Sequence, residues 1–179
     1  LDELALTEQT LVIFCSDNGG SGGSRNAPLR GKKSQMFEGG LRVCALLRYP
    51  PRIPAGTVCD EFLTTLEILP TVLAVAGVRP PAGLKLDVYD LLPVVCGEQP
   101  SPRPAMFWQR QDQMAARVGT WKWIRSGSDE FLFDLSADVS EQHNLLEARR
   151  DVAQELRSAF GSWRSEIEAA EPRGPFRDY

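Results

Sequence analysis

The feature that most constrains the fold is an apolar run that ends abruptly in a glycine-containing turn. Residues 11–15 are Leu-Val-Ile-Phe-Cys, and Ser16-Asp17-Asn18-Gly19-Gly20 follows at once. This pattern predicts a buried strand that runs into a tight turn. Ligands in open α/β sheets gather beyond the carboxyl ends of such strands, and Asp17 and Asn18 offer the oxygen donors that Ca²⁺ and Mg²⁺ prefer. The alternative is an ordinary turn, because Asp, Asn and Gly are also common turn formers.

Size and composition narrow the class of protein. A chain of 179 residues is enough for about one domain, and 42% hydrophobic with 25% charged residues is typical of a soluble globular protein. The net charge of -4 gives no support for nucleic-acid binding, and the apolar runs are too short for a membrane span. The chain opens with neither an initiator Met nor a signal peptide, so we expect a piece of a longer protein.

Cysteine and histidine are sparse. The cysteines are Cys15, Cys44, Cys59 and Cys96. They form no C-x-x-C pair and His143 is the single histidine, so a zinc cluster is not expected. Cys15 and Cys44 lie within apolar runs, and we predict that they are small core hydrophobes.

The first half of the chain alternates between apolar runs and a long polar segment. Residues 1–10 have helical spacing, and residues 11–16 and 41–49 are predicted to be buried strands. Between them, residues 17–40 form a Gly/Ser/Asn-rich segment of a length that is uncommon unless the loop is functional or disordered.

A helix is predicted over residues 61–76, with Pro70 marking its start or a kink and Gly77 its C-cap. Residues 78–104 are proline-rich, and we place a domain boundary there, between residues 98 and 99.

The C-terminal part is predicted to be a small sheet covered by one helix. Short strand signals separated by turns indicate an antiparallel meander. The predicted strands are 105–109, 114–118, 121–124 and 131–135. Apolar residues at helical spacing over 149–170 favour a helix packed on that sheet, and the tail 171–179 is expected to be frayed.

A second polar motif follows the first glycines. Residues 28–33 (Pro-Leu-Arg-Gly-Lys-Lys) place three cations beside a glycine, and a lysine ammonium can reach a sulfate or phosphate oxygen. A metal and a lysine together neutralise charge that grows on a transferred group. The alternative is that Lys32 and Lys33 form a solvated surface patch. Glu38 and Arg42, which straddle two glycines, are interpreted as a pair that braces a turn.

Taken in order, these motifs resemble the sulfatase family of the alkaline-phosphatase-like superfamily, of the arylsulfatase or N-acetylgalactosamine-6-sulfatase type. The series is S-D-N-G-G, P-L-R-G-x-K, E-G-G-x-R-V and a strand ending in proline, continued by residues 64–77, 86–93, 116–122 and 133–145. The family usually has Asp in place of Glu67. The resemblance covers nearly the whole chain and corresponds to roughly the C-terminal third of a sulfatase. It implies an α/β fold: residues 1–98 are the C-terminal segment of the mixed-sheet catalytic domain, and residues 99–179 are an α+β subdomain of antiparallel strands and a packed helix.

The resemblance also implies roles for single residues. Asp17 and Asn18 would be two ligands of the active-site Ca²⁺, with Mg²⁺ as the alternative ion, and Lys33 would contact the substrate sulfate. Lys32 stands where the family commonly has glycine, so which of the two lysines faces the site stays open. The implied reaction is sulfate-ester hydrolysis by a formylglycine made from a C/S-x-P-x-R motif. None of the cysteines here begins such a motif, so we expect the nucleophile upstream of this chain.

The leading hypothesis is therefore a sulfuric ester hydrolase that acts on a sulfated small molecule or a sulfated glycan. A phosphate or phosphonate ester hydrolase and a noncatalytic truncated module are the alternatives, and this chain alone is expected to be inactive. Arg110 is a candidate substrate-binding residue, whereas Phe107 and Trp108 beside it could instead pack in the core. His143 is expected in a turn or at the surface. Because sulfatases are often exported, the resemblance implies a periplasmic, secreted or lysosomal location for the protein.

Overall fold

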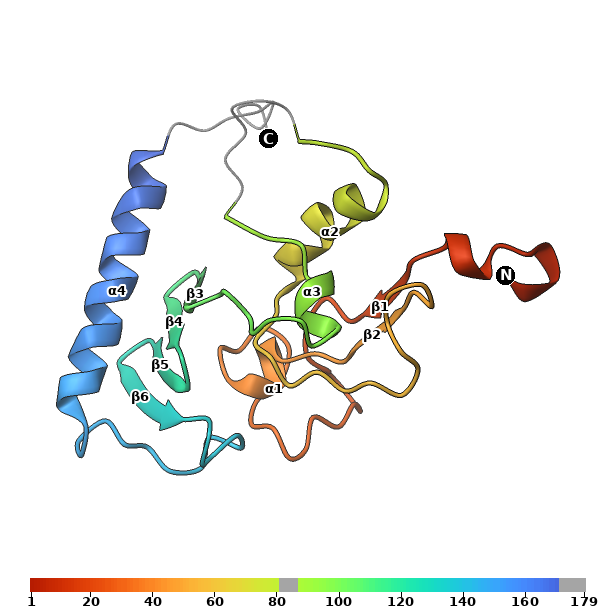
Figure 1. The fold of residues 1–179 in the computed structure, drawn as a ribbon. Helices are drawn as coiled ribbons and strands as arrows, with labels where there is room; N and C mark the ends of the chain where they lie inside the picture. The colour runs from red at the N-terminus through yellow and green to blue at the C-terminus, as the bar shows by residue number, and fades with distance from the viewer. Residues whose placement is uncertain (81–86, 171–179) are drawn as a thin grey trace, which may run out of the picture. The chain divides into compact units, whose positions relative to one another are not determined.

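The structure is a computed structural model that describes residues 1–80 and 87–170 (Figure 1). The chain divides into two compact units. The first unit comprises Leu1–Ser16 and Cys44–Pro104, and the second comprises Asp17–Val43 and the chain from Ala105 onward. The polar segment 17–43 therefore clusters with the C-terminal part of the chain. The domain boundary at residue 98 stays a prediction, and the tail expected to be frayed, 171–179, lies outside the described residues.

The first unit contains short helices and a two-stranded sheet. Its elements are the 3₁₀ helices η1 (Asp2–Leu4), η2 (Thr7–Gln9) and η3 (Thr65–Glu67), the strands β1 (Val12–Cys15) and β2 (Ala45–Arg48), and the helices α2 (Ile68–Val75) and α3 (Leu92–Val95). β1 pairs antiparallel with β2. The helix expected over residues 1–10 is wrong: Ala5 adopts a left-handed conformation with φ +53° and interrupts the run, which leaves η1 and η2.

Both predicted strands form, but the prediction that they are buried is wrong for this chain. Phe14 and Leu46 are cross-strand partners, and they are 60% and 66% exposed. Cys44 is exposed and Cys15 is only half-buried, so neither is a core residue. Within the described residues no third strand joins β1 and β2. Because a sheet face is buried only when another layer packs on it, the apolar side chains here stay at the surface.

The helix predicted over residues 61–76 begins at a capping box and ends at a glycine. The Glu67 carboxylate accepts a hydrogen bond of 2.6 Å from the Thr64 N–H, and the Thr64 hydroxyl accepts one from Leu66. Pro70 lies in the first turn of α2, where its missing N–H is tolerated. Gly77 has φ +67° and closes the helix. α2 begins at Ile68, two residues before the predicted start at Pro70, and residues 61–64 of the predicted helix are not helical. The predicted end at Gly77 is confirmed.

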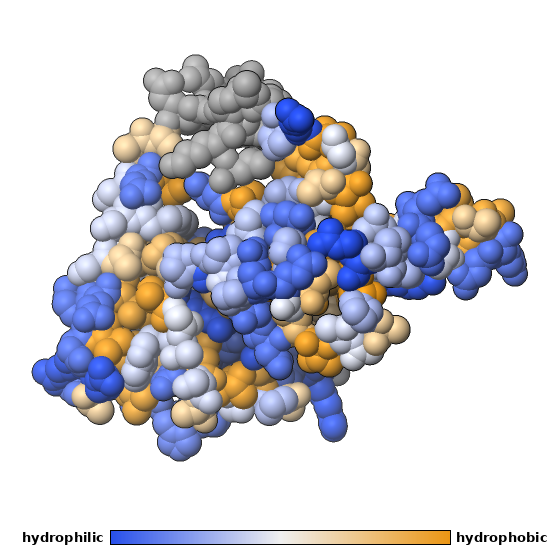
Figure 2. All heavy atoms as spheres, viewed as in Figure 1, coloured by the Kyte–Doolittle hydropathy of each residue, from blue (hydrophilic) through white to orange (hydrophobic). Residues whose placement is uncertain are grey.

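The core of the first unit lies around α3, which the sequence did not predict. Leu91, Leu92 and Val95 are buried, and Leu47 and Val75 pack against them. The outer side of α2 is hydrophobic at the surface, as Figure 2 shows. Leu69 and Val72 of α2 are exposed there, as is Leu66 of the preceding η3.

The second unit is a four-stranded sheet with a long helix. Its elements are α1 (Glu38–Leu41), β3 (Ala105–Arg110), β4 (Gln113–Val118), β5 (Trp121–Ser126), β6 (Asp129–Asp134) and α4 (Arg150–Ala169). The strands pair antiparallel in the order β3-β4-β5-β6, so the predicted meander is confirmed, and α4 confirms the predicted helix. Leu41 ends α1, and the strand predicted from residue 41 begins only at Ala45.

This sheet is covered on both faces because successive residues of a strand point to opposite sides. Trp123 and Leu132 face α4 and join a cluster with Leu156 and Phe160. Ala115, Ile124 and Phe133 face the other way and pack with Met36 from the 17–43 segment. The polar segment is therefore held on the sheet by its own apolar residue. None of the helices in the described ranges combines the length and the apolar character needed to cross a bilayer.

Candidate functional site

The two polar motifs of the sequence are brought together by backbone hydrogen bonds within the second unit. The Lys33 N–H donates to the Gly20 carbonyl oxygen over 3.1 Å. Asn26 joins the same two segments: its Oδ1 accepts from the Gly20 N–H at 2.9 Å, and its Nδ2 donates to the Gly20 and Gly31 carbonyls at 3.2 and 3.0 Å. The long loop is thus folded back on itself, and the lysine segment lies against the turn that follows Asp17 and Asn18.

Two glycines, Gly19 and Gly39, make this close packing sterically possible. A Cβ added at Gly19 would overlap the Gly39 carbonyl oxygen, and one added at Gly39 would lie 2.5 Å from the carbonyl oxygens of Arg30 and Gly31. The Gly19 N–H also donates to the Gly40 carbonyl over 3.0 Å. Because real Cβ atoms do not approach backbone oxygens this closely, side chains at these positions would force the segments apart.

The candidate metal ligands lie at the rim of this packed loop. Asp17 is exposed and Asn18 is half-buried. They offer one carboxylate and one amide oxygen, which suits a hard cation but is far short of the about six to eight oxygen ligands that Ca²⁺ takes. In the part of the chain that the structure describes, no group of three or more His, Cys, Asp or Glu side chains gathers as a metal site requires. The residues present therefore fit one side of such a site.

The turn between β3 and β4 reaches the lysine segment. Gln113, which lies opposite Arg110 in the hairpin, donates from Nε2 to the Ser34 carbonyl at 3.3 Å. Arg110 itself is exposed. Phe107 stacks on Trp163 of α4 with a centroid distance of 5.4 Å, and Trp108 packs on the opposite face of the sheet. The aromatic pair thus has a packing role, and the polar end of β3 lies near Ser34.

A buried ionic cluster holds α1 on the sheet, and the sequence did not predict it. Lys122 Nζ lies 2.7 Å from Glu38 Oε1 and 2.9 Å from Glu141 Oε1. All three side chains are buried. Burial raises the pKa of the Glu141 carboxyl even though Lys122 acts to lower it. The interpretation of Glu38 as the partner of Arg42 is wrong, because the Glu38 carboxylate turns inward to Lys122 while Arg42 stays exposed.

Strand alternation could have revealed part of this cluster. Lys122 and Ile124 lie two residues apart on β5 and share the face on which segment 17–43 packs. A lysine on a buried face requires a carboxylate partner. His143, by contrast, is at the surface as expected: its side chain is 82% exposed and its Nδ1 lies 3.4 Å from Asp138.

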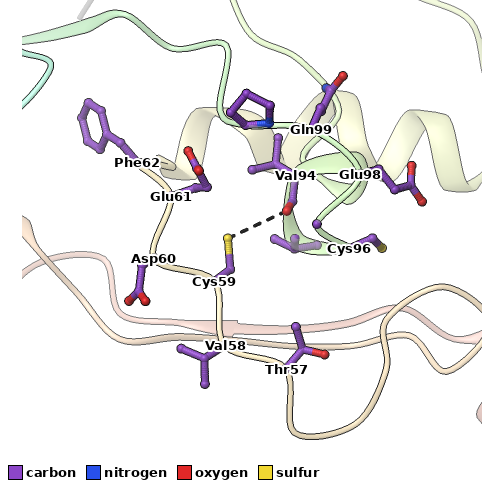
Figure 3. A pocket seen from close by; sticks show the side chains of 13 residues that line it. Thr57, Val58, Cys59, Asp60, Glu61, Phe62, Val94, Cys96, Glu98 and Gln99 are labelled. Atoms are coloured by element: carbon purple, nitrogen blue, oxygen red, sulfur yellow. Dashed lines mark hydrogen bonds between the residues drawn. The ribbon is translucent and has the colours of Figure 1, made fainter.

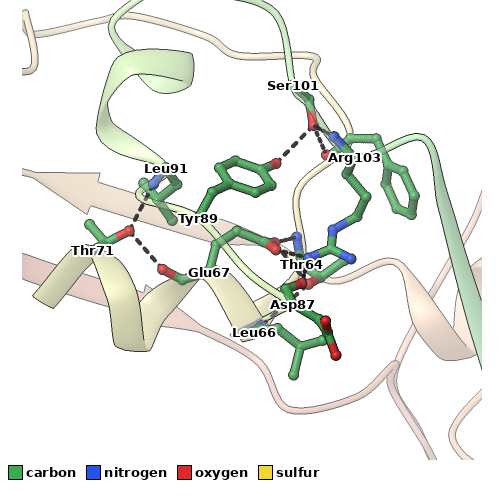
Figure 4. Close-up of polar contacts among 10 residues, drawn as sticks. Thr64, Leu66, Glu67, Thr71, Asp87, Tyr89, Leu91, Ser101 and Arg103 are labelled. Atoms are coloured by element: carbon green, nitrogen blue, oxygen red, sulfur yellow. Dashed lines mark hydrogen bonds and ion pairs between the residues drawn. The ribbon is translucent and has the colours of Figure 1, made fainter. Parts of the chain in front are cut away.

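The first unit has a polar cluster of its own, centred on Glu67 (Figure 4). Its buried carboxylate forms an ion pair with Arg103 and accepts the hydrogen bond from the Thr64 N–H in the capping box. Thr71 Oγ1 donates to the Glu67 carbonyl at 2.7 Å and accepts from the Leu91 N–H at 2.8 Å. These contacts tie the start of α2 to the segments before α3 and β3, which is a structural role.

An open pocket of about 590 Å³ also lies in the first unit (Figure 3). Residues 57–62 and 94–100 line it, and Asp60, Glu61 and Glu98 make it acidic. Cys59 Sγ lies 4.0 Å from the Val94 carbonyl oxygen. None of the residues predicted for the site lines this pocket.

Known proteins share both the sequence motifs and the fold. Residues 1–78 match the sequence profile of the sulfatase family. N-acetylgalactosamine-6-sulfatase of the dog (Canis lupus familiaris) is 36% identical over 138 residues, which cover 70% of this chain and 26% of that protein. Human arylsulfatase A is 31% identical over 212 aligned positions, which cover 98% of this chain and 41% of that protein. The chain belongs to the sulfatase family. It spans between about a quarter and two fifths of the length of these relatives.

A solved structure extends the likeness to the fold of this chain. The crystal structure of Ps i-CgsB in complex with k-i-k-neocarrahexaose matches with a TM-score of 0.81 and 26% identity. The match covers 91% of this chain and 38% of that one. The predicted fold class, the C-terminal α/β portion of a sulfatase followed by an antiparallel sheet with a packed helix, is confirmed.

Proposed function

We propose that the intact protein is a sulfuric ester hydrolase and that this chain contributes a sulfate-contacting lysine and two calcium ligands. The observation that carries the proposal is the hydrogen bond from the Lys33 N–H to the Gly20 carbonyl. It keeps the lysine segment beside the turn that bears Asp17 and Asn18, so a cation and two oxygen donors are available within one folded loop.

The chemistry follows from charge. As the ester S–O bond breaks, negative charge grows on the sulfate oxygens and on the leaving oxygen, and a fixed cation stabilises that charge. Lys33 supplies one such cation, and Asp17 and Asn18 hold part of the coordination of a calcium ion, which supplies Lewis-acid stabilisation when bound. A formylglycine nucleophile and the remaining metal ligands are expected from a part of the protein outside this chain.

We further propose that the substrate is a sulfated sugar or a smaller sulfate ester. The canine relative is named for a sulfated amino sugar, and the Ps i-CgsB structure holds a neocarrahexaose. Arg110 is exposed on a hairpin whose Gln113 contacts the Ser34 carbonyl, and a guanidinium suits hydrogen bonding to sulfate or sugar oxygens. Arg110→Ala in the intact enzyme should shift the preference among sulfated sugars and leave aryl sulfate turnover unchanged.

The test of the reaction uses the intact protein with an aryl sulfate and the matching aryl phosphate. Lys33→Ala should lower kcat/KM for the sulfate by about 10²–10³, the loss found when one preorganised charge-stabilising group is removed. Lys32→Ala is the matched control and should change kcat/KM little. Chelation of calcium should abolish turnover, and added calcium should restore it.

Three outcomes would contradict this proposal. A larger loss in Lys32→Ala than in Lys33→Ala would reverse the lysine assignment. Faster hydrolysis of the phosphate than of the sulfate would favour the phosphate ester hydrolase. Absence of turnover of either ester would favour the noncatalytic module. The 179-residue chain by itself should show no turnover.

A further inference from the structure

We propose that Glu141 and Lys122 are positioning residues for the sulfate site, which they influence through α1 without contacting substrate. The inference rests on the proposed function of Lys33, Asp17 and Asn18. It is carried by a continuous set of contacts that runs from the buried face of the sheet, through Glu38, to the glycines that pack against the lysine segment.

The first step is that the buried ionic cluster of Lys122, Glu38 and Glu141 holds α1 in place. Lys122 Nζ contacts Glu38 Oε1 at 2.7 Å, and the Glu38 N–H donates to Glu141 Oε2 at 2.6 Å. Glu38 is therefore held by both its side chain and its backbone. Hydrogen bonds to charged groups in a water-excluded site are short and directional, so they fix the position of the first residue of α1.

The second step is that Glu141 also holds the start of the lysine segment, through Arg30. Arg30 Nη1 donates to the Glu141 carbonyl at 3.0 Å, and its guanidinium lies 4.1 Å from the centroid of the Phe37 ring and 5.1 Å from that of Phe131. Glu141 itself has φ +53°, a conformation that a non-glycine residue rarely adopts unless its surroundings hold it there. One residue between β6 and α4 thus holds both ends of the stretch from residue 30 to residue 38.

The third step connects α1 to the candidate groups. The Gly39 N–H donates to the Arg30 carbonyl over 2.6 Å, and a Cβ at Gly40 would lie 2.6 Å from the Lys32 carbonyl oxygen. On the other side, the Gly19 N–H donates to the Gly40 carbonyl. The backbone that carries Lys33 and the backbone that follows Asn18 both rest on these two glycines. A shift of α1 must therefore move both candidate groups.

The choice of charged residues favours positioning over stability. A buried ion pair contributes little net stability, and hydrophobic residues of the same volume often serve as well or better. What an ionic cluster supplies is a defined register between two surfaces. Here those surfaces are the sheet and α1, and a misplacement of about 1 Å at a reacting group is enough to cost about a hundredfold in rate.

The test uses Glu141→Gln in the intact enzyme, because glutamine keeps the size of the side chain and removes its charge. Steady-state kinetics with an aryl sulfate, inhibition by inorganic sulfate and hydrogen exchange of residues 17–43 are measured. We expect kcat/KM to fall about tenfold or more, the inhibition constant of sulfate to rise, and exchange to accelerate at residues 30–40 while the β4 and β5 amides stay protected.

Glu130→Gln is the matched control. Glu130 pairs with Arg157 in the same unit, and both side chains of the pair are partly buried. Among the described residues, the contacts that hold α1 and its glycines come from other side chains. This variant should leave kinetics and sulfate inhibition within about twofold of wild type, as expected for a partly exposed ion pair.

Several results would overturn the proposal. Equal behaviour of Glu141→Gln and Glu130→Gln in an active enzyme refutes the positioning role and leaves the proposed function intact. If the wild-type protein hydrolyses no sulfate ester, the proposed function fails, and the exchange data still decide whether Glu141 holds residues 30–40. If Glu141→Gln does not fold, Glu38→Gln replaces it, since the Glu38 N–H to Glu141 is retained. Unchanged kinetics and exchange in that variant refute the proposal.

Discussion

Lys122→Met is the substitution that most directly probes the interior of the second unit. Lys122 is completely buried on β5 and lies within 3 Å of two carboxylates, at 2.7 Å from Glu38 and 2.9 Å from Glu141. Methionine has nearly the same length and fills the same space without charge. The change therefore removes the cation and leaves two buried carboxylates side by side.

The expected loss of unfolding free energy in Lys122→Met follows from the number of charged groups in direct contact with Lys122. Removing one partner of a buried ionic cluster costs about 3–5 kcal/mol of unfolding free energy, because an uncompensated charge stays buried. Glu141→Gln should cost less, about 1–3 kcal/mol, the range for a buried group that loses a hydrogen bond to a charged partner. The Lys122–Glu38 pair at 2.7 Å survives in that variant. Lys122→Met should therefore be the more damaging substitution.

Tryptophan fluorescence during guanidinium denaturation measures this difference. The four tryptophans, Trp108, Trp121, Trp123 and Trp163, all lie in the second unit. Burial raises the pKa of Glu141 above its ordinary value of 4.5, and Lys122 opposes that rise. The folded state then binds the Glu141 proton more tightly than the unfolded state, so this residue's contribution to stability falls as pH rises above about 4.5. Without Lys122 the fall is steeper, and the deficit of Lys122→Met should be larger at pH 7 than at pH 5.

The reasoning has a clear point of failure. If Lys122→Met costs no more than Glu141→Gln at pH 7, the two carboxylates are not held by Lys122 as the geometry indicates. If the deficit of Lys122→Met grows on acidification, the raised pKa of Glu141 is contradicted, because protonation should relieve the buried charge.

Other substitutions test the remaining features. Glu67→Gln should destabilise the first unit by about 3–5 kcal/mol, since Arg103 loses its buried partner; far-UV circular dichroism is the measurement, and a loss below about 1 kcal/mol would contradict it. Asp138→Asn tests pH dependence. Burial acts to raise the pKa of Asp138, but the N–H groups of His143 and Gln142 hold it below its usual value, so its stabilisation is present above about pH 4 and lost as pH falls further. This variant should cost about 1 kcal/mol at pH 7 and nothing at pH 2. Phe160→Ala should cost about 3–5 kcal/mol in the tryptophan assay, whereas Ile167→Ala on the exposed side of α4 should cost little.

The sequence predicts the second unit well because its signals are local. Alternating residues and turns such as Gly119-Thr120 determine β3 to β6, and the apolar stripe of α4 matches the face of the sheet that it covers. The same kind of signal gives α2 its start and end. These features depend on residues a few positions apart, and their period is visible without knowledge of the rest of the chain.

Burial of the first strands could not be predicted in the same way. The apolar run at residues 11–15 indicates a strand correctly, but burial depends on what packs against it, and Phe14 is exposed here. The ionic cluster around Lys122 could not be predicted from the sequence for a related reason. The alternation of side chains along β5 places Lys122 on a covered face of the sheet. Its partners, however, are distant in sequence: Glu38 lies 84 residues earlier, and Glu141 follows β6. A sequence pattern carries no information about which distant segment docks there.

The conformation of the candidate site therefore has two separate sources. The first source is local: Asp17, Asn18 and Lys33 lie within one segment of fewer than thirty residues, and their residue types and spacing can be recognised in the sequence. Glycines allow that segment to fold back on itself. The position of the folded segment on the sheet involves Met36 and, in our proposal, Glu141, which lies 103 residues after Glu38 and accepts a hydrogen bond from its N–H. If both conditions are needed, a peptide of residues 17–43 alone should not hold Lys33 beside the Asp17 turn. Lys122 on the sheet and Glu141 after β6, both distant in sequence from Lys33, then become determinants of reactivity without touching a substrate.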